Sequence, residues 1–280
     1  MATIDLQKKS VKIVLEKKQI THVKARVGLV LDITGSMRTL YKNGTVQRVV
    51  ERILAVASQF DDDGLLDVWV YDNEFSRLKP VSERDFEGYV NRIILENDLI
   101  HKFGRNDEPP VMKDVLKKYM QEDDSQDPAF VVFINDGGCK KTIKSIIEAS
   151  ATKPLFWQFV GIGNGNFEFL QKIDTLEGRF VDNANFIHIE DIDAISDEQL
   201  YDALLNEFPS WLKEAKEKGV IKELAPQKEV ATPIKQSTKK EVPTPTRQTS
   251  KIEESAPTKQ APAEIESKPK KGFLSRLFGK

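Results

Sequence analysis

The chain has 280 residues, a formal net charge of −2 and 31% charged residues. This length is enough for one large domain with a substantial core. The slight acidic excess argues against a nucleic-acid-binding protein, which would be strongly basic. The single cysteine rules out an intramolecular disulfide and favours a reducing compartment. Because no apolar run approaches the length of a membrane span and no signal-peptide pattern is seen, we expect a cytoplasmic protein.

The residues up to about Ile20 predict a helix, although a strand through Val11, Ile13 and Leu15 fits nearly as well. Beyond them, short apolar runs alternate with helical patterns. The apolar runs predict strands at Val27–Leu31, Leu66–Tyr71, Phe130–Ile134, Leu155–Val160 and Phe186–Ile189. The helical patterns predict helices near Val46–Ala57, Arg84–Leu95, Val111–Met120, Lys141–Ala151, Phe167–Ile173 and Asp197–Lys218.

Strands that alternate with helices indicate right-handed crossovers and a mostly parallel sheet with helices on both faces. The segment Phe75–Val81 follows the second strand after a tight turn and predicts a short antiparallel edge strand, where Pro80 is tolerated. We therefore expect an open, doubly wound α/β domain. The expected boundaries are a helical extension over residues 1–22 and the α/β domain over residues 23–222.

The composition changes after residue 222. Residues 223–280 carry 12 Lys or Arg against 7 Asp or Glu and hold 7 of the 13 prolines. Residues 223–267 are predicted to be a disordered basic linker, because so few apolar residues cannot offset the chain entropy lost on folding. Residues 268–280 (KPKKGFLSRLFGK) place apolar side chains at helical spacing beside basic ones and predict a short segment that docks on a partner or, less strongly, on a membrane.

Oxygen-bearing side chains follow the first strand at alternate positions. Asp32 ends the apolar run, Thr34 and Ser36 come next, and Gly35 allows a tight turn between them. Residues two apart in a loop can present their side chains to one point, and three oxygens suit a hard divalent cation such as Mg²⁺. The alternative is a plain strand-to-helix turn in which Asp or Ser caps the next helix.

A second strand ends in the same way. Asp136 follows the run Phe130–Ile134 and precedes two glycines. In open parallel sheets, sites form outside the carboxyl ends of the strands where the strand order reverses. Two acids at two such ends therefore favour a shared metal site.

The motif D-x-T-G-S at Asp32–Ser36, with the later Asp136-Gly137, resembles the metal-ion-dependent adhesion site of von Willebrand factor A (vWA) domains. Longer segments resemble a bacterial subgroup, the vWA proteins of tellurite-resistance (Ter) and stress-response operons. These segments are LEKKQITHVKARVGLVLDITGSM, FWQFVGIGNGNFEFLQKIDTL, GRFVDNANFIHIEDI and SDEQLYDALLNEFPSWLKEA. Together they span most of residues 10–218.

The resemblance implies that Thr34 and Ser36 ligate Mg²⁺ directly, while Asp32 and Asp136 act mainly through bound water. It also implies a threonine from a third loop. In FGRNDEPPVMKDVL that position falls on Asn106, whose carbonyl oxygen could substitute, and Asp107 beside it is an additional candidate that would bring an anion to the site. Mn²⁺ and Ca²⁺ are the other candidate cations.

The sequence thus predicts a non-enzymatic, metal-dependent interaction module, and the resemblance implies that it acts in tellurite resistance or stress response. Its metal would present an open position to an acidic residue of a partner protein, which by resemblance is another protein of the same operon. Two alternatives stay open: a metal-dependent hydrolase or phosphotransferase, and a scaffold that binds only through its C-terminal segment.

Three other features give weak signals. GIGNGNF (Gly161–Phe167) lacks the third glycine of a dinucleotide-binding loop and predicts a tight turn with an asparagine cap. The three histidines are scattered and do not support a zinc site. Cys139 lies just beyond Asp136, where a reactive thiol is conceivable, but a packing role is favoured.

Overall fold

The computed structural model describes residues 3–60 and 63–222, which belong to one compact unit of the chain. The predicted linker 223–267 and docking segment 268–280 lie outside the described residues. Among the helices of the described part, none is long and apolar enough to cross a membrane.

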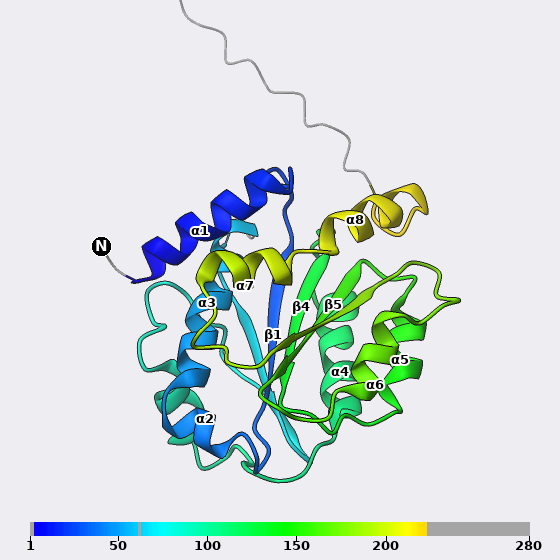
Figure 1. Ribbon diagram of the computed structural model, residues 1–280. Coiled ribbons are helices and arrows are strands. Elements are labelled where there is room, and N and C mark those ends of the chain that lie inside the picture. Colours follow the sequence, from blue (N-terminus) through cyan, green and yellow to red (C-terminus); the bar gives the residue numbers. More distant parts are fainter. Residues whose placement is uncertain (1–2, 61–62, 223–280) are drawn as a thin grey trace, which may run out of the picture. The chain divides into compact units, whose positions relative to one another are not determined.

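A six-stranded sheet forms the centre of the domain (Figure 1). Its strands are β1 (Arg26–Asp32), β2 (Asp67–Tyr71), β3 (Phe75–Arg77), β4 (Ala129–Asn135), β5 (Leu155–Ile162) and β6 (Ala184–Ile189). They lie in the order β3-β2-β1-β4-β5-β6, and every neighbouring pair is parallel except β2 with β3. The predicted doubly wound, mostly parallel sheet with one antiparallel edge strand is confirmed.

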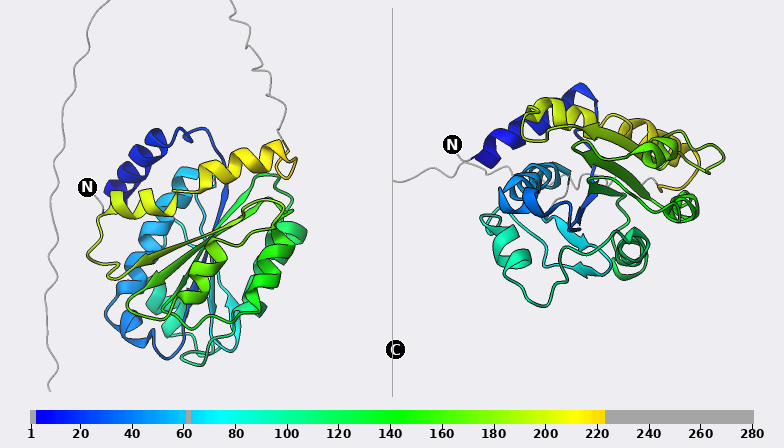
Figure 2. Two further views of the ribbon diagram at one scale, coloured as in Figure 1. Left: turned by 45° about the vertical axis from the view of Figure 1, so that its right-hand side comes forward. Right: turned by 60° about the horizontal axis from the view of Figure 1, so that its bottom comes forward.

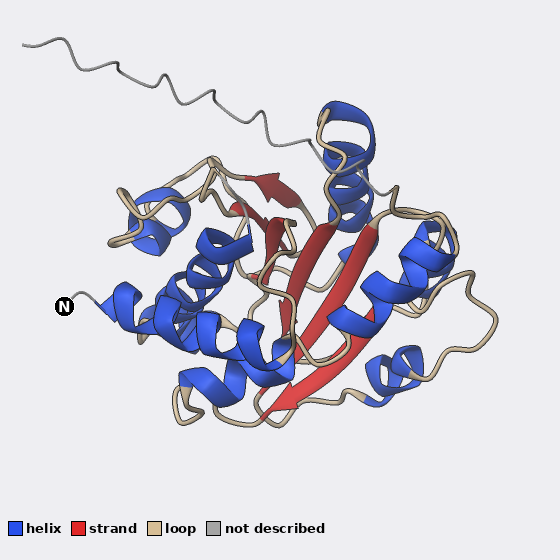
Figure 3. Cartoon of the chain, turned by 90° about the horizontal axis from the view of Figure 1, so that it is seen from above, coloured by secondary structure: helices blue, strands red, loops and turns tan. Residues whose placement is uncertain are grey.

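Helices cover both faces of this sheet (Figures 1 and 3). One face carries α1 (Thr3–Lys17), α2 (Arg38–Lys42), α3 (Thr45–Phe60), the π-helix η1 (Val90–Leu95), α7 (Asp197–Leu204) and α8 (Phe208–Glu217). The other face carries α4 (Glu108–Lys117), the π-helix η2 (Lys118–Glu122), α5 (Ile143–Ser150) and α6 (Glu168–Asp174).

The strand residues alternate between two apolar cores, one on each face. In β4, Val132 and Ile134 belong to the core under α1 and α3, while Val131 and Phe133 belong to the core under α4 and α5. This explains why the strands are continuous apolar runs: both of their faces are buried. The N-terminal helix α1 packs beside α3 and α7 (Figure 2), so the predicted extension is part of this core.

Several helices differ from the prediction. The predicted helix Asp197–Lys218 is two helices, because Pro209 in the first turn of α8 has no N–H to donate and cannot continue α7. Of the predicted helix Arg84–Leu95 only the π-helix η1 forms, since the backbone at Gly88 is left-handed (φ 61°). The edge strand is also shorter than predicted: β3 ends at Arg77, and Val81 returns to pair with Leu66 through an isolated bridge.

The strand order reverses between β1 and β4. From β1 the chain continues outward to β2 and β3, and it then crosses back to place β4 on the other side of β1. The carboxyl ends of β1 and β4 therefore lie side by side, at the lower end of the sheet in Figure 1. This is the position at which open α/β sheets form binding sites.

Candidate metal centre

The loop after β1 folds around its own carboxylate. Asp32 is fully buried, and its Oδ1 accepts a hydrogen bond of 2.6 Å from the backbone N–H of Thr34. The hydroxyl oxygens of Thr34 and Ser36 lie 3.2 Å apart. The alternate spacing of these residues thus brings three side-chain oxygens to the same side of the loop, as the sequence predicts.

The loop after β4 meets this loop directly. The Ser36 hydroxyl donates a 3.0 Å hydrogen bond to Oδ1 of Asp136. On its other side the loop after β4 contacts the loop after β5, where a Cβ on Gly165 would lie 1.9 Å from the Asp136 carbonyl oxygen. The two strand-end motifs, 100 residues apart, therefore form one cluster with the four predicted residues in it.

The third loop brings Asn106 to the same place. Its amide nitrogen donates to the carbonyl oxygens of Gly137 (2.9 Å) and Gly138 (3.3 Å). Its carbonyl oxygen is buried and has no hydrogen-bond partner among the described residues. This leaves Oδ1 as the free oxygen of the side chain, which is the atom that a metal would use.

Asp107 and Glu108 differ sharply in where their carboxylates lie. Asp107 forms an ion pair with Lys140 (2.8 Å) and is partly exposed. Glu108, at the start of α4, is fully buried, and its Oε2 accepts a 3.1 Å hydrogen bond from the backbone N–H of Lys140. The structure therefore makes Glu108, which the sequence did not single out, the inward-facing acid of this loop.

A second acid that sequence reasoning missed positions the third loop. Asp72 follows β2 and is fully buried. Its Oδ2 accepts from the backbone N–H of Gly104 (2.8 Å) and lies 2.7 Å from Nδ1 of His101. A Cβ on Gly104 would lie 1.9 Å from the Asn73 amide oxygen and 2.9 Å from Oδ2 of Asp72, so a larger residue would displace both side chains. The available signal was an acid directly after a predicted strand, the same signal that identified Asp32 and Asp136.

The third loop is also tied to the first by the backbone. The N–H of Phe103 donates to the Ile33 carbonyl (2.7 Å), and the N–H of Gly35 donates to the Gly104 carbonyl (3.1 Å). Asn106 is thus held against the other candidate ligands by a rigid frame, independent of any ligand.

A family model described as the vWA domain found in the TerF C terminus matches residues 24–221. The chain belongs to the TerF-like vWA family. It is 80% identical over 229 residues to the uncharacterized protein YcbR of Bacillus subtilis (strain 168), which covers 82% of this chain and 94% of that protein.

Two solved structures illustrate the wider similarity of this TerF-like domain. The ArnB paralog VWA2 from Sulfolobus acidocaldarius is 15% identical with a TM-score of 0.41, over 66% of this chain and 45% of that one. Proximal thread matrix protein 1 from the mussel byssus, with a zinc-occupied MIDAS motif, is 12% identical with a TM-score of 0.44, over 65% and 47%. The TerF-like chain thus spans less than half the length of either.

Burial controls the electrostatics of this TerF-like site. It raises the pKa of Asp32 to about 7, and the nearby Asp136 and Glu108 carboxylates add to the rise. Burial likewise raises the pKa of Asp136 and of Glu108. Three carboxyl groups with raised pKa values therefore lie in one cluster, and a cation placed among them would lower these pKa values and favour the ionised carboxylates.

The unpaired oxygens show how a metal would fit. Oδ2 of Asp32, Oδ1 of Asn106 and Oε1 of Glu108 are buried and have no hydrogen-bond partner within the part of the chain that the structure describes. Leaving such atoms unpaired costs free energy, which a cation would recover. The described residues hold no group of three or more His, Cys, Asp or Glu placed to bind a metal, so the hydroxyls of Thr34 and Ser36 and the Asn106 amide are needed. This all-oxygen donor set fits Mg²⁺.

The neighbouring weak signals have structural explanations. Asn166 accepts a hydrogen bond from the backbone N–H of Glu168 (3.0 Å) in a turn just before α6, so the tight turn predicted for GIGNGNF is present. The N-cap position of α6 is Phe167, so the prediction of an asparagine cap is wrong. Burial and the adjacent Glu108 raise the pKa of the Cys139 thiol well above its ordinary value, which disfavours a reactive thiolate.

Proposed function

We propose that this TerF-like domain is a non-enzymatic, metal-dependent interaction module that works in the cytoplasm. Thr34 and Ser36 would bind Mg²⁺ directly, Asn106 would contribute its carbonyl oxygen, and Asp32 and Asp136 would orient the hydroxyls and bound water. The metal, when bound, would supply an open coordination position for a carboxylate of a partner protein.

The observation that carries this proposal is the junction of the three loops. Ser36 contacts both Thr34 (3.2 Å) and Asp136 (3.0 Å), while the free oxygens of Asp32 and Asn106 are buried without partners among the described residues. A capping role for Asp32 or Ser36 does not require three separate loops to meet, as they do through Ser36–Asp136, Asn106–Gly137 and Gly35–Gly104. It also leaves the unpaired oxygens without a purpose.

The residues themselves define what the site does in this proposal. The buried Asp32 fixes the turn through the Thr34 N–H, and Asp136 fixes the Ser36 hydroxyl. The supporting acids thus hold the two hydroxyl ligands in place before a metal arrives, which reduces the ordering cost of binding.

The proposed biological role is tolerance of tellurite or a related stress, with another protein of the same operon as the partner. It is supported by the family match to the TerF C-terminal vWA domain. A strain that lacks this gene should lose tolerance on tellurite medium. The wild-type gene should restore tolerance, and Ser36→Ala should not.

Calorimetric titration of Mg²⁺ and Mn²⁺ into the full chain tests the site. We expect saturable binding that weakens at least about tenfold in Ser36→Ala, because removal of supporting or direct ligands typically costs that much. Ser145→Ala is the matched control, since Ser145 is an exposed serine on α5 whose hydroxyl only bonds a local carbonyl. If the wild type binds neither cation, or if Ser36→Ala binds as well as Ser145→Ala, the proposal is wrong.

A further inference from the structure

A groove opens next to the candidate metal centre, between the loop after β4 and helix α6. Its volume is about 430 Å³. Its lining residues include Gly138, Cys139, Lys141, Asn166, Phe169 and Lys172. One contact joins it to the site: Asn106 donates to the Gly138 carbonyl (3.3 Å). The Gly138 N–H in turn donates to the carbonyl of a second lining residue, Asn166 (3.3 Å). A ligand that extends from the metal past Asn106 would therefore meet the groove at Gly138.

The groove combines an apolar wall with basic side chains. Phe169 and Cys139 are half-buried and pack against the core under α4 to α6, which leaves part of each for a ligand. Lys141 is exposed and forms no ion pair with the described residues. Lys172 pairs with the one acid of the groove, Glu168 (2.5 Å). The net charge of the groove is therefore positive.

Basic side chains also lie close in sequence to the candidate ligands of the other two loops. Arg38 comes two residues after Ser36, and its guanidinium lies over the Phe103 ring (4.0 Å). Arg105 directly precedes Asn106 and is exposed. Neither arginine forms an ion pair with any residue that the structure describes. All three loops that supply candidate ligands thus carry an unpaired cation close to them in sequence.

This arrangement of charge is informative because a metal alone does not explain it. The buried acids of the site attract a cation, whereas Arg38, Arg105 and Lys141 repel one. Basic groups that adjoin the ligand loops in the sequence instead favour a ligand that is itself anionic and extends beyond the metal. A small anion would satisfy the cations but would leave the wall at Phe169 without a function.

We propose that the site recognises a short acidic segment of a protein. In this segment, one carboxylate takes the open position on the metal, the apolar side chain of an adjacent residue packs against Phe169, and a second carboxylate pairs with Lys141. This inference rests on the proposed function and extends it from a single acidic residue to a short motif. The apolar wall and the cations give the site selectivity among the many exposed acids of other proteins.

A peptide library tests this motif. Short capped peptides with one fixed aspartate and randomised neighbours are captured on the immobilised full chain, once with saturating Mg²⁺ and once with EDTA. We expect the captured peptides to be enriched in an apolar residue next to the aspartate and in a second acid. Lys141→Glu should weaken the best peptide about tenfold, or 1.4 kcal/mol. Lys144→Glu, an exposed lysine of α5 that does not line the groove, is the matched control.

Each outcome decides between the two proposals. Capture of the fixed aspartate in Mg²⁺ without preference for its neighbours overturns the motif and leaves the metal function intact. The same preference in EDTA supports the groove and overturns the requirement for metal. Equal loss in Lys141→Glu and Lys144→Glu, or no capture above an aspartate-free library, overturns the motif. Displacement of the best peptide by inorganic phosphate at comparable concentration would overturn it in favour of a phosphate-bearing ligand.

Phe169→Leu, which keeps an apolar side chain, should retain binding better than Phe169→Ser.

Discussion

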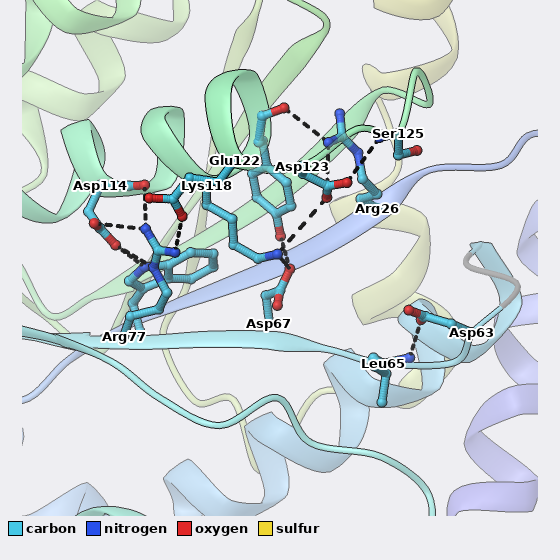
Figure 4. A network of polar contacts seen from close by, with 12 residues as sticks. Arg26, Asp63, Leu65, Asp67, Arg77, Asp114, Lys118, Glu122, Asp123 and Ser125 are labelled. Carbon is cyan, nitrogen blue, oxygen red and sulfur yellow. Dashed lines mark hydrogen bonds and ion pairs between the residues drawn. The ribbon is translucent and has the colours of Figure 1, made fainter.

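Two charged clusters lie at opposite ends of the same sheet, and they differ in how their buried groups are satisfied. The amino-edge network consists of Arg26, Asp67, Arg77, Asp114, Lys118, Glu122 and Asp123 (Figure 4). In it, Arg77 forms two hydrogen bonds with the Asp114 carboxylate (2.8 and 2.9 Å). Arg26 donates to the Tyr119 carbonyl (3.0 Å) and pairs with Asp123 (3.2 Å). At the candidate metal centre, by contrast, Asp32, Glu108 and Asp136 form no ion pair with any basic side chain of the described residues, and the nearby Lys140 pairs with Asp107 instead.

The pKa values of the acids express this difference. Burial opposes the ionisation of Asp114, but Arg77 and the Trp69 N–H hold its pKa below the ordinary value. Asp67 is the exception, since burial raises its pKa although Lys118 (3.2 Å) and Tyr119 (2.9 Å) bond it. At the metal centre burial dominates, and the pKa of Asp32 rises to about 7. The first cluster is complete within the chain, whereas the second has the properties of a site that is completed by a cation from outside.

The largest expected effect comes from breaking the complete cluster. Arg26→Met should destabilise the domain by about 3 kcal/mol, because it removes the hydrogen bonds of the buried Arg26 to the Tyr119 and Asp127 carbonyls and leaves Asp123 only the more distant Lys118 (4.0 Å). Urea unfolding monitored by tryptophan fluorescence measures this change. Metal binding should persist under native conditions, since Arg26 lies at the amino end of β1 and the site lies at its carboxyl end.

Lys213→Met is the control for this prediction, because Lys213 is largely exposed and has only a weak contact with Glu217 (4.0 Å). It should change the unfolding free energy by less than about 0.5 kcal/mol. If Arg26→Met cost no more than this control, the amino-edge network would not stabilise the fold and the contrast between the two clusters would disappear.

The next effect is the pH dependence of the incomplete cluster. A raised folded-state pKa means that the folded form keeps its proton longer than the unfolded form, so stability falls as the pH rises from about 4 to about 7. In EDTA, Asp32→Asn should therefore unfold several degrees above the wild type at pH 8, with a smaller difference at pH 5. Mg²⁺ should stabilise only the wild type. Thermal unfolding at both pH values measures this, and a variant less stable than the wild type at pH 8 would contradict it.

The sequence predicted the sheet well, for a physical reason. Both faces of the parallel strands are buried, so they appear in the sequence as short, continuous apolar runs. Their short length and their content of β-branched and aromatic residues distinguish these runs from buried helices. The helices were predicted less well where local backbone constraints override periodicity. Pro209 divides the predicted helix Asp197–Lys218, and Gly88 prevents a regular helix before Val90. Both residues were visible in the sequence. The prediction followed the apolar periodicity, which continues past them, and so missed the helix boundaries that they mark.

In the candidate site, too, some residues could be predicted from the sequence and others could not. Asp32, Thr34, Ser36 and Asp136 could be placed together because each directly follows a strand, and parallel strands end at one edge. Asp72 also directly follows a strand, so the same rule could have placed it with them. Glu108 could not be placed, because its position depends on the path of the long loop between η1 and α4. That path is fixed by contacts such as Phe103 N–H to the Ile33 carbonyl, which no periodicity encodes.

Glu108 also provides a sharper test of the incomplete cluster. Glu108→Gln keeps the size of the side chain and its acceptor for the Lys140 N–H but removes the buried negative charge. We expect Mg²⁺ affinity to fall about tenfold, as is typical when a group that supports a metal ligand is altered. Asp107→Asn is the matched control, since this carboxylate pairs with Lys140 instead. Calorimetric titration of both variants with Mg²⁺ decides which carboxylate supports metal binding. If Asp107→Asn weakened binding more than Glu108→Gln, that carboxylate would be Asp107.

The smallest expected effect lies at the exposed end of the amino-edge network. Hydrogen bonds from Arg77 and Lys117 lower the pKa of Glu122 to about 2, so its contribution to stability is present at neutral pH and is lost as the pH falls below about 4. Because Glu122 is exposed, solvent and salt screen these contacts. Glu122→Gln should therefore shift the urea midpoint only slightly at low salt, and high salt should remove that shift. A large, salt-resistant loss, comparable to that of Arg26→Met, would show that the network acts as one cooperative unit. The contribution of each charged side chain to stability would then depend on how many ion pairs connect it to the network, and not on how deeply it is buried.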